Sequence, residues 1–276
     1  MSVEPAYGSA MLLMLGALAL FLVLFLVYLW QSGWGRGGAA RTGPAYTLRP
    51  IAGYEAANEG LALSAETGRS VHTSPGTGSI GAQGVGSAAT LAGMAVVESM
   101  ARVSAITGAP VQATTNDAIA YLLTDNALRR GARRAGWSLD SEGGDVRFMT
   151  HADPLAYVAG ATDVVEGQKV SSAVMVGQFG PEVLILTEVQ RRNGAQQIIG
   201  ASDHQALALI NISADHTLIG EEIFASGAYL ERRTTHIAAL LAQDGLRWAV
   251  IVLIVLGFII GNALGINWNE VVSVIP

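Results

Sequence analysis

The sequence contains no cysteine, a single lysine and few charges. The lack of cysteine excludes disulfide bonds, thiolate catalysis and zinc sites built on cysteine. Lys169 is the only lysine and lies outside any G-x-x-x-x-G-K-[ST] pattern, so a Walker A loop is absent. The motifs G-x-S-x-G and H-E-x-x-H are absent as well. A formal net charge of −6 argues against nucleic-acid binding, since proteins that bind nucleic acids carry a basic excess.

Apolar residues take the place of the missing charges. Charged residues make up 14% of the 276 positions, hydrophobic residues make up 51%, and the mean hydropathy is +0.40. A soluble protein of this size carries more charge, so this composition indicates membrane segments.

Two uncharged apolar runs, residues 9–30 and 248–266, are long enough to cross a bilayer core of about 20 helical residues. Aromatic residues flank both runs, as at membrane interfaces. A cleaved signal peptide is the alternative for the first run, but no basic residue precedes it. We therefore predict two transmembrane helices.

The basic residues predict the orientation. All 16 Lys and Arg lie between Arg36 and Arg247, which places the central segment in the cytoplasm and both termini outside the plasma membrane. The predicted organisation is an external tail 1–8, transmembrane helix 9–30, linker 31–45, cytoplasmic α/β domain 46–220, connecting helix 221–247, transmembrane helix 248–266 and external tail 267–276.

The second run also carries a repeated G-x-x-x-G pattern at Gly257, Gly261 and Gly265, with Asn262 beside it. Glycines at this spacing let a second helix backbone approach closely, and the asparagine can hydrogen-bond across the contact. The partner helix is either the first span or a second copy of the chain. We expect a homo-oligomer that is embedded in the lipid bilayer.

Between the spans, short β-branched runs alternate with helical stretches. This alternation predicts an α/β, Rossmann-like domain with a mostly parallel sheet, flanked by an N-terminal and a C-terminal transmembrane helix. Expected strands are 61–64, 69–73, 111–114, 146–150, 170–176 and 196–200. Expected helices are 87–107, 117–135, 154–165, 181–192 (its residues 184–189 read alternatively as a strand), 203–212, and one long helix running from about residue 220 into the second span.

Residues 74–86 form the densest glycine stretch, and three of its glycines have G-x-G-x-x-G spacing. Together with the polar residues that follow the predicted strands, the stretch predicts a site at the carboxyl edge of the sheet. Its backbone N–H groups suit a small anionic ligand such as a phosphate or carboxylate. The candidate ligand-binding residues are Ser74, Gly76, Thr77, Gly78, Ser79, Gly81, Thr115, Asn116, Asp117, His151, Asp153, Ser202 and Asp203.

Other interpretations of these residues stay open. Serine, threonine, asparagine and aspartate before a helix serve first as N-caps. A dinucleotide site is disfavoured because no acidic residue ends a strand about 20 residues after the glycines, and Asp117 lies nearly twice as far away. His151 with Asp153 could form an acid–base pair, and Asp203 with His204 could contribute to a metal site. We assign no catalytic residue, no metal and no cofactor.

The stretch GSIGAQGVGSAATLAGMAVVESMARVSAITGAPVQATTNDAIAYLLTDNALR and the later SADHTLIGEEIF are similar to an uncharacterised two-span membrane family of Chloroflexi-like bacteria and some archaea. The resemblance covers nearly the whole chain and implies no activity. We therefore expect a membrane protein whose cytoplasmic domain binds, senses or assembles. The alternative is a membrane-anchored enzyme that acts on a nucleotide or another phosphorylated small molecule at the glycine-rich loop.

Overall fold

The computed structural model describes residues 4–31, 48–81, 85–136, 145–149, 153–231 and 234–263. The chain divides into two compact units. One unit, Thr47–Arg232, is the sheet domain. The other, Met1–Tyr46 with Arg233–Pro276, is the helical unit, which contains the first and last helices of the chain.

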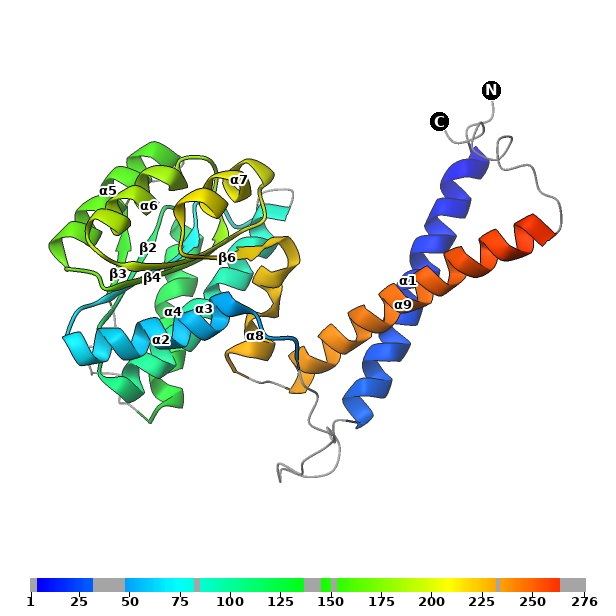
Figure 1. Ribbon diagram of the computed structural model, residues 1–276, viewed down its shortest axis with the longest axis horizontal. Helices are drawn as coiled ribbons and strands as arrows, with labels where there is room; N and C mark the ends of the chain where they lie inside the picture. The colour runs from blue at the N-terminus through cyan, green and yellow to red at the C-terminus, as the bar shows by residue number, and fades with distance from the viewer. Residues whose placement is uncertain are drawn as a thin grey trace. The chain divides into compact units, whose positions relative to one another are not determined.

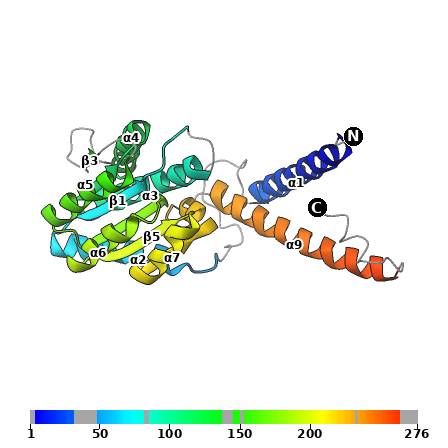
Figure 2. The ribbon, with the colours of Figure 1, turned by 90° about the horizontal axis from the view of Figure 1, so that it is seen from above.

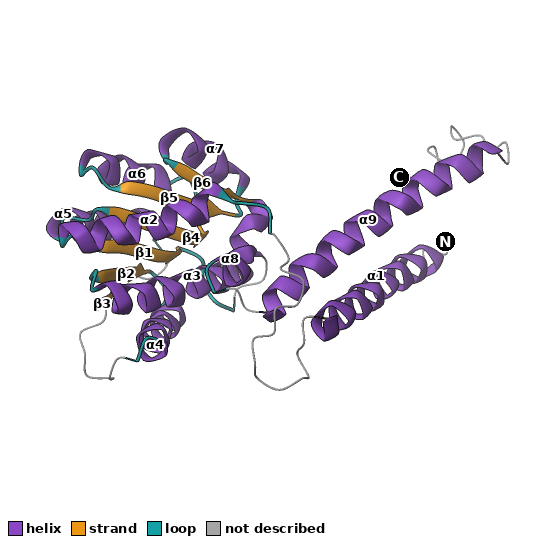
Figure 3. Cartoon of the chain, turned by 60° about the horizontal axis from the view of Figure 1, so that its bottom comes forward, coloured by secondary structure: helices purple, strands orange, loops and turns teal. Residues whose placement is uncertain are grey.

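The sheet domain is built on six parallel strands that lie side by side in one sheet (Figure 3). Their order is β3-β2-β1-β4-β5-β6, the strand order of Rossmann folds. The α/β class and the Rossmann-like parallel sheet are therefore confirmed. The strands are β1 Val71–Gly76, β2 Val111–Thr115, β3 Asp145–Phe148, β4 Ser172–Gln178, β5 Gln196–Ala201 and β6 His216–Ile219.

Helices cover both faces of this sheet (Figure 1). One face packs against α2 (Ala52–Thr67), α3 (Val85–Thr107) and α4 (Ala118–Arg134). The other face packs against α5 (Pro154–Gly167), α6 (Val183–Arg192) and α7 (His204–Ser213). Both faces of the central strands are therefore buried: all six residues of β1 and the first six of β4 are buried.

Helix α3 is the central helix of its face. Its alanine and methionine residues favour a helix, and Val97, Met100 and Ala101 are fully buried. Gly93 lets it lie directly on the sheet, because a Cβ there would overlap the carbonyl oxygen of Val176 in β4. The helix ends at Gly108, which has a φ of +80° and donates its N–H to the Ser104 carbonyl. The predicted buried helix is thus confirmed.

The structure differs from the expected elements in three places. Residues 61–64 belong to α2 and not to a strand, because the surrounding alanine and glutamate residues favour a helix. Strand β6 was not predicted, since its four residues carry too short a pattern. The long helix expected from residue 220 is interrupted: a 3-10 helix η1 (Gly220–Ala225) and a short α8 (Ser226–Tyr229) come first, and α9 begins at Thr234.

The two ends of the sheet domain are held together. The Tyr229 hydroxyl donates to the Arg49 carbonyl at 2.6 Å, and the Tyr54 hydroxyl donates to the Glu222 carbonyl at 2.7 Å. The two tyrosine rings stack with centroids 5.3 Å apart, and Arg49 pairs with the Glu222 carboxylate at 3.2 Å. Both connections to the helical unit therefore leave the domain from neighbouring points.

The helical unit contains α1 (Glu4–Gln31) and α9 (Thr234–Ala263), whose chain directions are opposite (Figure 2). Gly245 marks a close approach between them, since a Cβ there would lie 3.4 Å from Leu24 Cδ1. A Cβ at Gly257 would meet no atom within 4 Å. Gly261 and Asn262 lie on α9 and Gly265 lies outside the described residues, so packing through the glycine stripe stays a prediction.

Two described helical stretches are long and apolar enough to cross a membrane by length and composition: Gly86–Thr107 and Thr234–Ile259. The first is 67% buried and belongs to the core of the sheet domain, whereas the second is only 6% buried. A shorter apolar stretch, Met14–Trp30, lies in α1. The exposed apolar stretch of α9 and the shorter one of α1 are compatible with a membrane protein.

Candidate functional site

The strand order reverses between the neighbouring strands β1 and β4: the chain continues from β1 to β2 on one side and from β4 to β5 on the other. The loops that follow β1 and β4 therefore start side by side and lead in opposite directions. Gly76 ends β1 with a φ of +100°, and a Cβ there would overlap the Gln178 carbonyl oxygen at the end of β4. The Thr77 N–H donates to the same carbonyl at 2.7 Å. In open parallel sheets, this reversal at the carboxyl edge is where ligands bind.

The loop after β2 meets the glycine-rich loop at this edge. The Ser79 hydroxyl donates to Asp117 Oδ2 at 3.1 Å, while Asp117 Oδ1 accepts from the Ala120 N–H and caps α4. The Asn116 amide donates to the Thr77 carbonyl at 3.1 Å. Asp117 therefore both caps a helix and contacts the loop that follows the neighbouring strand.

Two buried acceptors beside this contact have no hydrogen-bond partner in the described chain. They are Asn116 Oδ1 and Thr115 Oγ1, in residues that are 4% and 0% exposed. A buried polar atom without a partner costs about 1–3 kcal/mol, so native proteins leave few of them. Asn116, whose amide contacts the glycine-rich loop, therefore has an oxygen that lacks a donor.

A carboxylate bridges the loops after β1 and β4. Glu182 Oε1 accepts from the Gly180 N–H at 2.9 Å and from the Thr77 hydroxyl at 3.1 Å. On the other side of β4, the Ser202 hydroxyl donates to Gln178 Oε1 at 2.8 Å. Together with Asp117, Glu182 makes the surroundings of the loop acidic.

Of the glycines of the G-x-G-x-x-G pattern, only the first has the role that it has in dinucleotide-binding loops. Gly76 makes the tight turn, but Gly78 packs against the protein: a Cβ there would lie 2.6 Å from Thr90 Oγ1. A Cβ at Gly81, the third glycine, would meet no atom within 4 Å, and Gly93 in α3 provides the close packing of helix on sheet. The spacing alone was therefore a weak guide to the role of each glycine.

A buried chain of hydroxyl groups lies beneath the loop. Ser74 Oγ donates to the Thr114 carbonyl and accepts from the Gly76 N–H, so the Tyr157 hydroxyl, 2.7 Å away, must donate to Ser74. Thr114 Oγ1, 2.9 Å from the tyrosine oxygen, must then donate to it. His72 Nε2, 2.9 Å from Thr114 Oγ1, must carry a hydrogen. Every donor in this chain has one acceptor.

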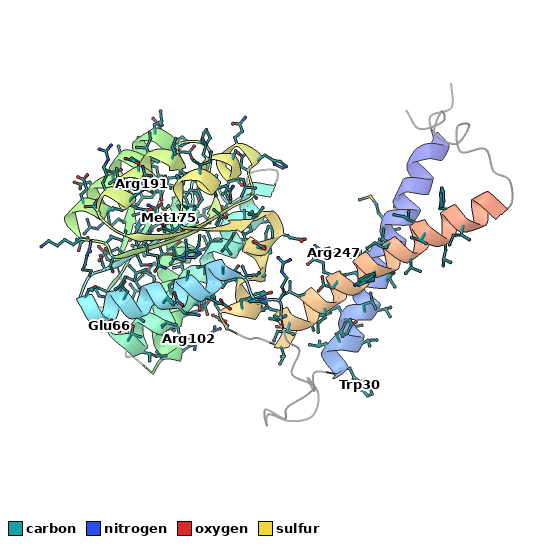
Figure 4. The ribbon with its side chains drawn as sticks, in the orientation of Figure 1. Trp30, Glu66, Arg102, Met175, Arg191 and Arg247 are labelled. Carbon is teal, nitrogen blue, oxygen red and sulfur yellow. The ribbon has the colours of Figure 1, made fainter. Side chains whose placement is uncertain are left out.

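With the hydrogen on Nε2, His72 is neutral when its Nδ1 accepts a hydrogen bond. Its Nδ1 faces the Gln190 side-chain amide at 3.2 Å, and that amide also donates to Met175 Sδ in the interior of the domain (Figure 4). Burial lowers the pKa of His72 to about 4. Burial also raises the pKa of Tyr157, which therefore stays protonated. This row of hydrogen-bonded side chains supports the end of β1 and carries no charge.

The structure brings together some of the predicted residues and separates others. Those at or directly beneath the switch point between β1 and β4 are Ser74, Gly76, Thr77, Gly78, Ser79, Thr115, Asn116 and Asp117, with Ser202 at the adjacent end of β5. Asp153 and Asp203 cap α5 and α7. Gly81 donates its N–H to the Ser87 hydroxyl. His151 lies outside the described residues.

Two residues of the site were missed by sequence reasoning, Glu182 and Tyr157. Glu182 comes shortly after β4 and just before α6, so its place after a strand was a usable signal. Tyr157 lies inside α5 and contacts β1 only through the tertiary fold, so no local pattern identified it. The described residues contain no group of three or more His, Cys, Asp or Glu that could hold a metal ion.

Comparison with known proteins gives the family of the chain. A family model described as a domain of unknown function, DUF6754, matches residues 12–272, and the chain therefore belongs to this family. None of the curated proteins and none of the solved structures matches the chain. The expected membership of an uncharacterised family is confirmed, while its taxonomic range and membrane topology stay predictions.

Proposed function

We propose that this member of the DUF6754 family is anchored in the plasma membrane by α1 and α9 and binds a small ribose-containing ligand through its sheet domain. The apolar side chains of α9 between Val250 and Ile259 support the anchoring, since they are exposed along the whole stretch. The distribution of Lys and Arg supports a cytoplasmic sheet domain with both termini outside.

One observation carries the ligand proposal: Asp117 follows β2 and contacts the glycine-rich loop through Ser79 at 3.1 Å. In dinucleotide-binding sheets of this strand order, an acidic residue at the end of β2 binds the ribose hydroxyls. The sequence spacing argued against this role, because about 20 residues normally separate the glycines from the acid. Here α3 alone has 23 residues and starts only at Val85, which accounts for the longer spacing.

The Ser79 hydroxyl occupies the place that a ribose hydroxyl would take. It donates to Asp117 Oδ2 and is itself exposed on the loop. A ligand hydroxyl that replaces it would keep the aspartate hydrogen-bonded and could also supply the donor that Asn116 Oδ1 lacks. Gly78 and Gly81 do not have the roles of the second and third glycines of a dinucleotide-binding loop. We therefore propose a site for a ribose and not for a complete dinucleotide.

The experiment is a thermal unfolding assay of the full chain in detergent with adenosine, ADP and NAD. A ligand at one hundred times its dissociation constant stabilises a protein by about 2.7 kcal/mol, so at least one of the three should raise the melting temperature. Asp117→Asn keeps a good N-cap but removes the charged acceptor, and it should abolish the shift. Asp203→Asn, the same change at the cap of α7, is the matched control. No shift with any of the three compounds would contradict the proposal.

Two further parts of the proposal have their own tests. Proteolysis in oriented vesicles should cleave the sheet domain only from the cytoplasmic side. Gly261→Leu should shift the mass of the detergent-solubilised protein if the stripe on α9 joins two copies. Turnover of a stabilising nucleotide would favour instead the membrane-anchored enzyme that acts at the same loop.

A further inference from the structure

A carboxylate of the protein lies between the loops after β1 and β4 at the switch point. Glu182 Oε1 accepts from the Gly180 N–H at 2.9 Å and from the Thr77 hydroxyl at 3.1 Å, and so joins the loops after β4 and β1. A phosphate bound there would have to displace this carboxylate or lie beside it.

Three helix N-termini at the carboxyl edge of the sheet carry aspartate caps. Asp117 caps α4 through the Ala120 N–H, Asp153 caps α5 through the Leu155 and Ala156 N–H groups, and Asp203 caps α7 in the same manner. A free helix N-terminus attracts anions, but an aspartate cap uses those N–H groups and adds a negative charge.

The described loops at this edge contain no positive side chain to balance these carboxylates. Residues 77–81, 116–117, 179–182 and 202–203 include neither lysine nor arginine. Sites that bind phosphate commonly supply such a cation or a metal ion. The charges at the switch point therefore oppose a phosphate group.

Two groups here lack partners: an amide oxygen, which only accepts, and a hydroxyl, which can donate or accept. Asn116 Oδ1 and Thr115 Oγ1 are buried and unpartnered within the described chain. The Asn116 amide is held against the glycine-rich loop by its bond to the Thr77 carbonyl at 3.1 Å, so its free oxygen lies at the same loop. A hydroxyl or amino group on a ligand would satisfy Asn116 Oδ1, whereas a phosphate, which only accepts, would not.

We infer that the switch point takes an uncharged, hydrogen-bond-donating ligand such as a nucleoside, and that Glu182 excludes the phosphorylated form. This inference rests on the proposed ribose site and narrows it. It also changes the expectation of a small anionic ligand, because the N–H groups of Gly76, Thr77 and Gly81 in the glycine stretch already donate to the Ser74 hydroxyl, the Gln178 carbonyl and the Ser87 hydroxyl.

Calorimetric titration of the full chain in detergent with adenosine and AMP tests this inference, with EDTA present so that no divalent cation shields the phosphate. Wild-type protein should bind adenosine at least about tenfold more tightly than AMP, a difference of about 1.4 kcal/mol. Glu182→Gln keeps an acceptor oxygen for Gly180 and Thr77 but removes the charge. It should raise the affinity for AMP by about tenfold or more and change that for adenosine by less than about twofold.

Glu188→Gln is the matched control, since it makes the same change nearby, in α6, at a half-buried residue paired with Arg191 and Arg192. It should leave both affinities as in the wild type. Wild-type binding of AMP as tight as that of adenosine would overturn the inference, as would an unchanged preference in Glu182→Gln. Binding of neither compound would contradict the ribose site itself, and the inference would fall with it.

Discussion

Helices α3 and α9 have the same kind of sequence and opposite surroundings. Both contain a stretch of more than 20 residues that is apolar enough to cross a membrane, yet 67% of one stretch and 6% of the other is buried within the chain. The residues that meet their side chains account for the difference. Gly93 brings α3 onto the backbone of β4, whereas a Cβ at Gly257 of α9 would meet no atom within 4 Å.

The comparison teaches that hydropathy measures a need for an apolar environment and does not specify which one. A sheet satisfies this need for α3, and on our proposal lipid satisfies it for α9. Charge separates the two more clearly: α3 carries Glu98, whose side chain is 8% exposed and pairs with Arg130 and Arg134 of α4. The stretch 248–259 of α9 carries no charge.

The largest expected effect comes from placing an arginine in each helix. Val97→Arg puts a charge at a fully buried position of α3, where several kcal/mol of desolvation should unfold the sheet domain and make it protease-sensitive. Val252→Arg in α9 should leave the sheet domain folded and reduce membrane integration, measured by alkaline extraction. Equal protease resistance of the two variants would contradict the assignment of α3, and not α9, to the core of the sheet domain.

The next largest difference between the two helices is expected when a glycine in each is replaced by alanine. Gly93→Ala places a Cβ onto the Val176 carbonyl oxygen and should destabilise the sheet domain by about 3 kcal/mol. Gly257→Ala has open space around it in the chain and should leave the unfolding midpoint unchanged. Urea unfolding followed by circular dichroism measures both, and a loss in the second variant alone would reverse the assignment.

Acid should affect the sheet domain through His72. Its pKa is about 4 when folded and 6.5 when unfolded, so the folded state holds it neutral. The resulting stability is complete above pH 6.5 and is lost as the pH falls toward 4, by about 3 kcal/mol at that point. The stability difference between wild type and His72→Gln should therefore shrink from pH 7.5 to pH 4. His204→Gln, at an exposed histidine, should show no such trend.

The smallest effect concerns the charge in α3. Glu98→Gln breaks the pairs with Arg130 and Arg134, whose side chains are 46% and 43% exposed. Because water screens these arginines, the expected loss is only about 1 kcal/mol, or a few degrees in the melting temperature. An unchanged melting temperature would show that the pairs contribute no net stability and that α3 is held by its apolar contacts alone.

Local patterns predicted most of the sheet domain because its strands and helices carry strong periodicities. The helices that begin near Pro154 and Asp117 matched closely, since proline and aspartate mark helix starts chemically. Residues 61–64 were misread because a short apolar run does not distinguish a strand from part of a helix. The helix expected from residue 220 was interrupted by the contacts of Tyr229 with Arg49, which no local pattern contains.

The sequence by itself determined the α/β class, the two apolar ends and the position of the glycine-rich loop, because each depends on composition or on neighbours along the chain. Only the tertiary structure decided that α3 is a core helix, that Asp117 lies beside Ser79, and that Glu182 bridges two loops. These facts depend on which strands are neighbours in the sheet. The reversal between β1 and β4 joins residues about 100 positions apart, such as Thr77 and Gln178, and spacing along the chain carries no record of that contact.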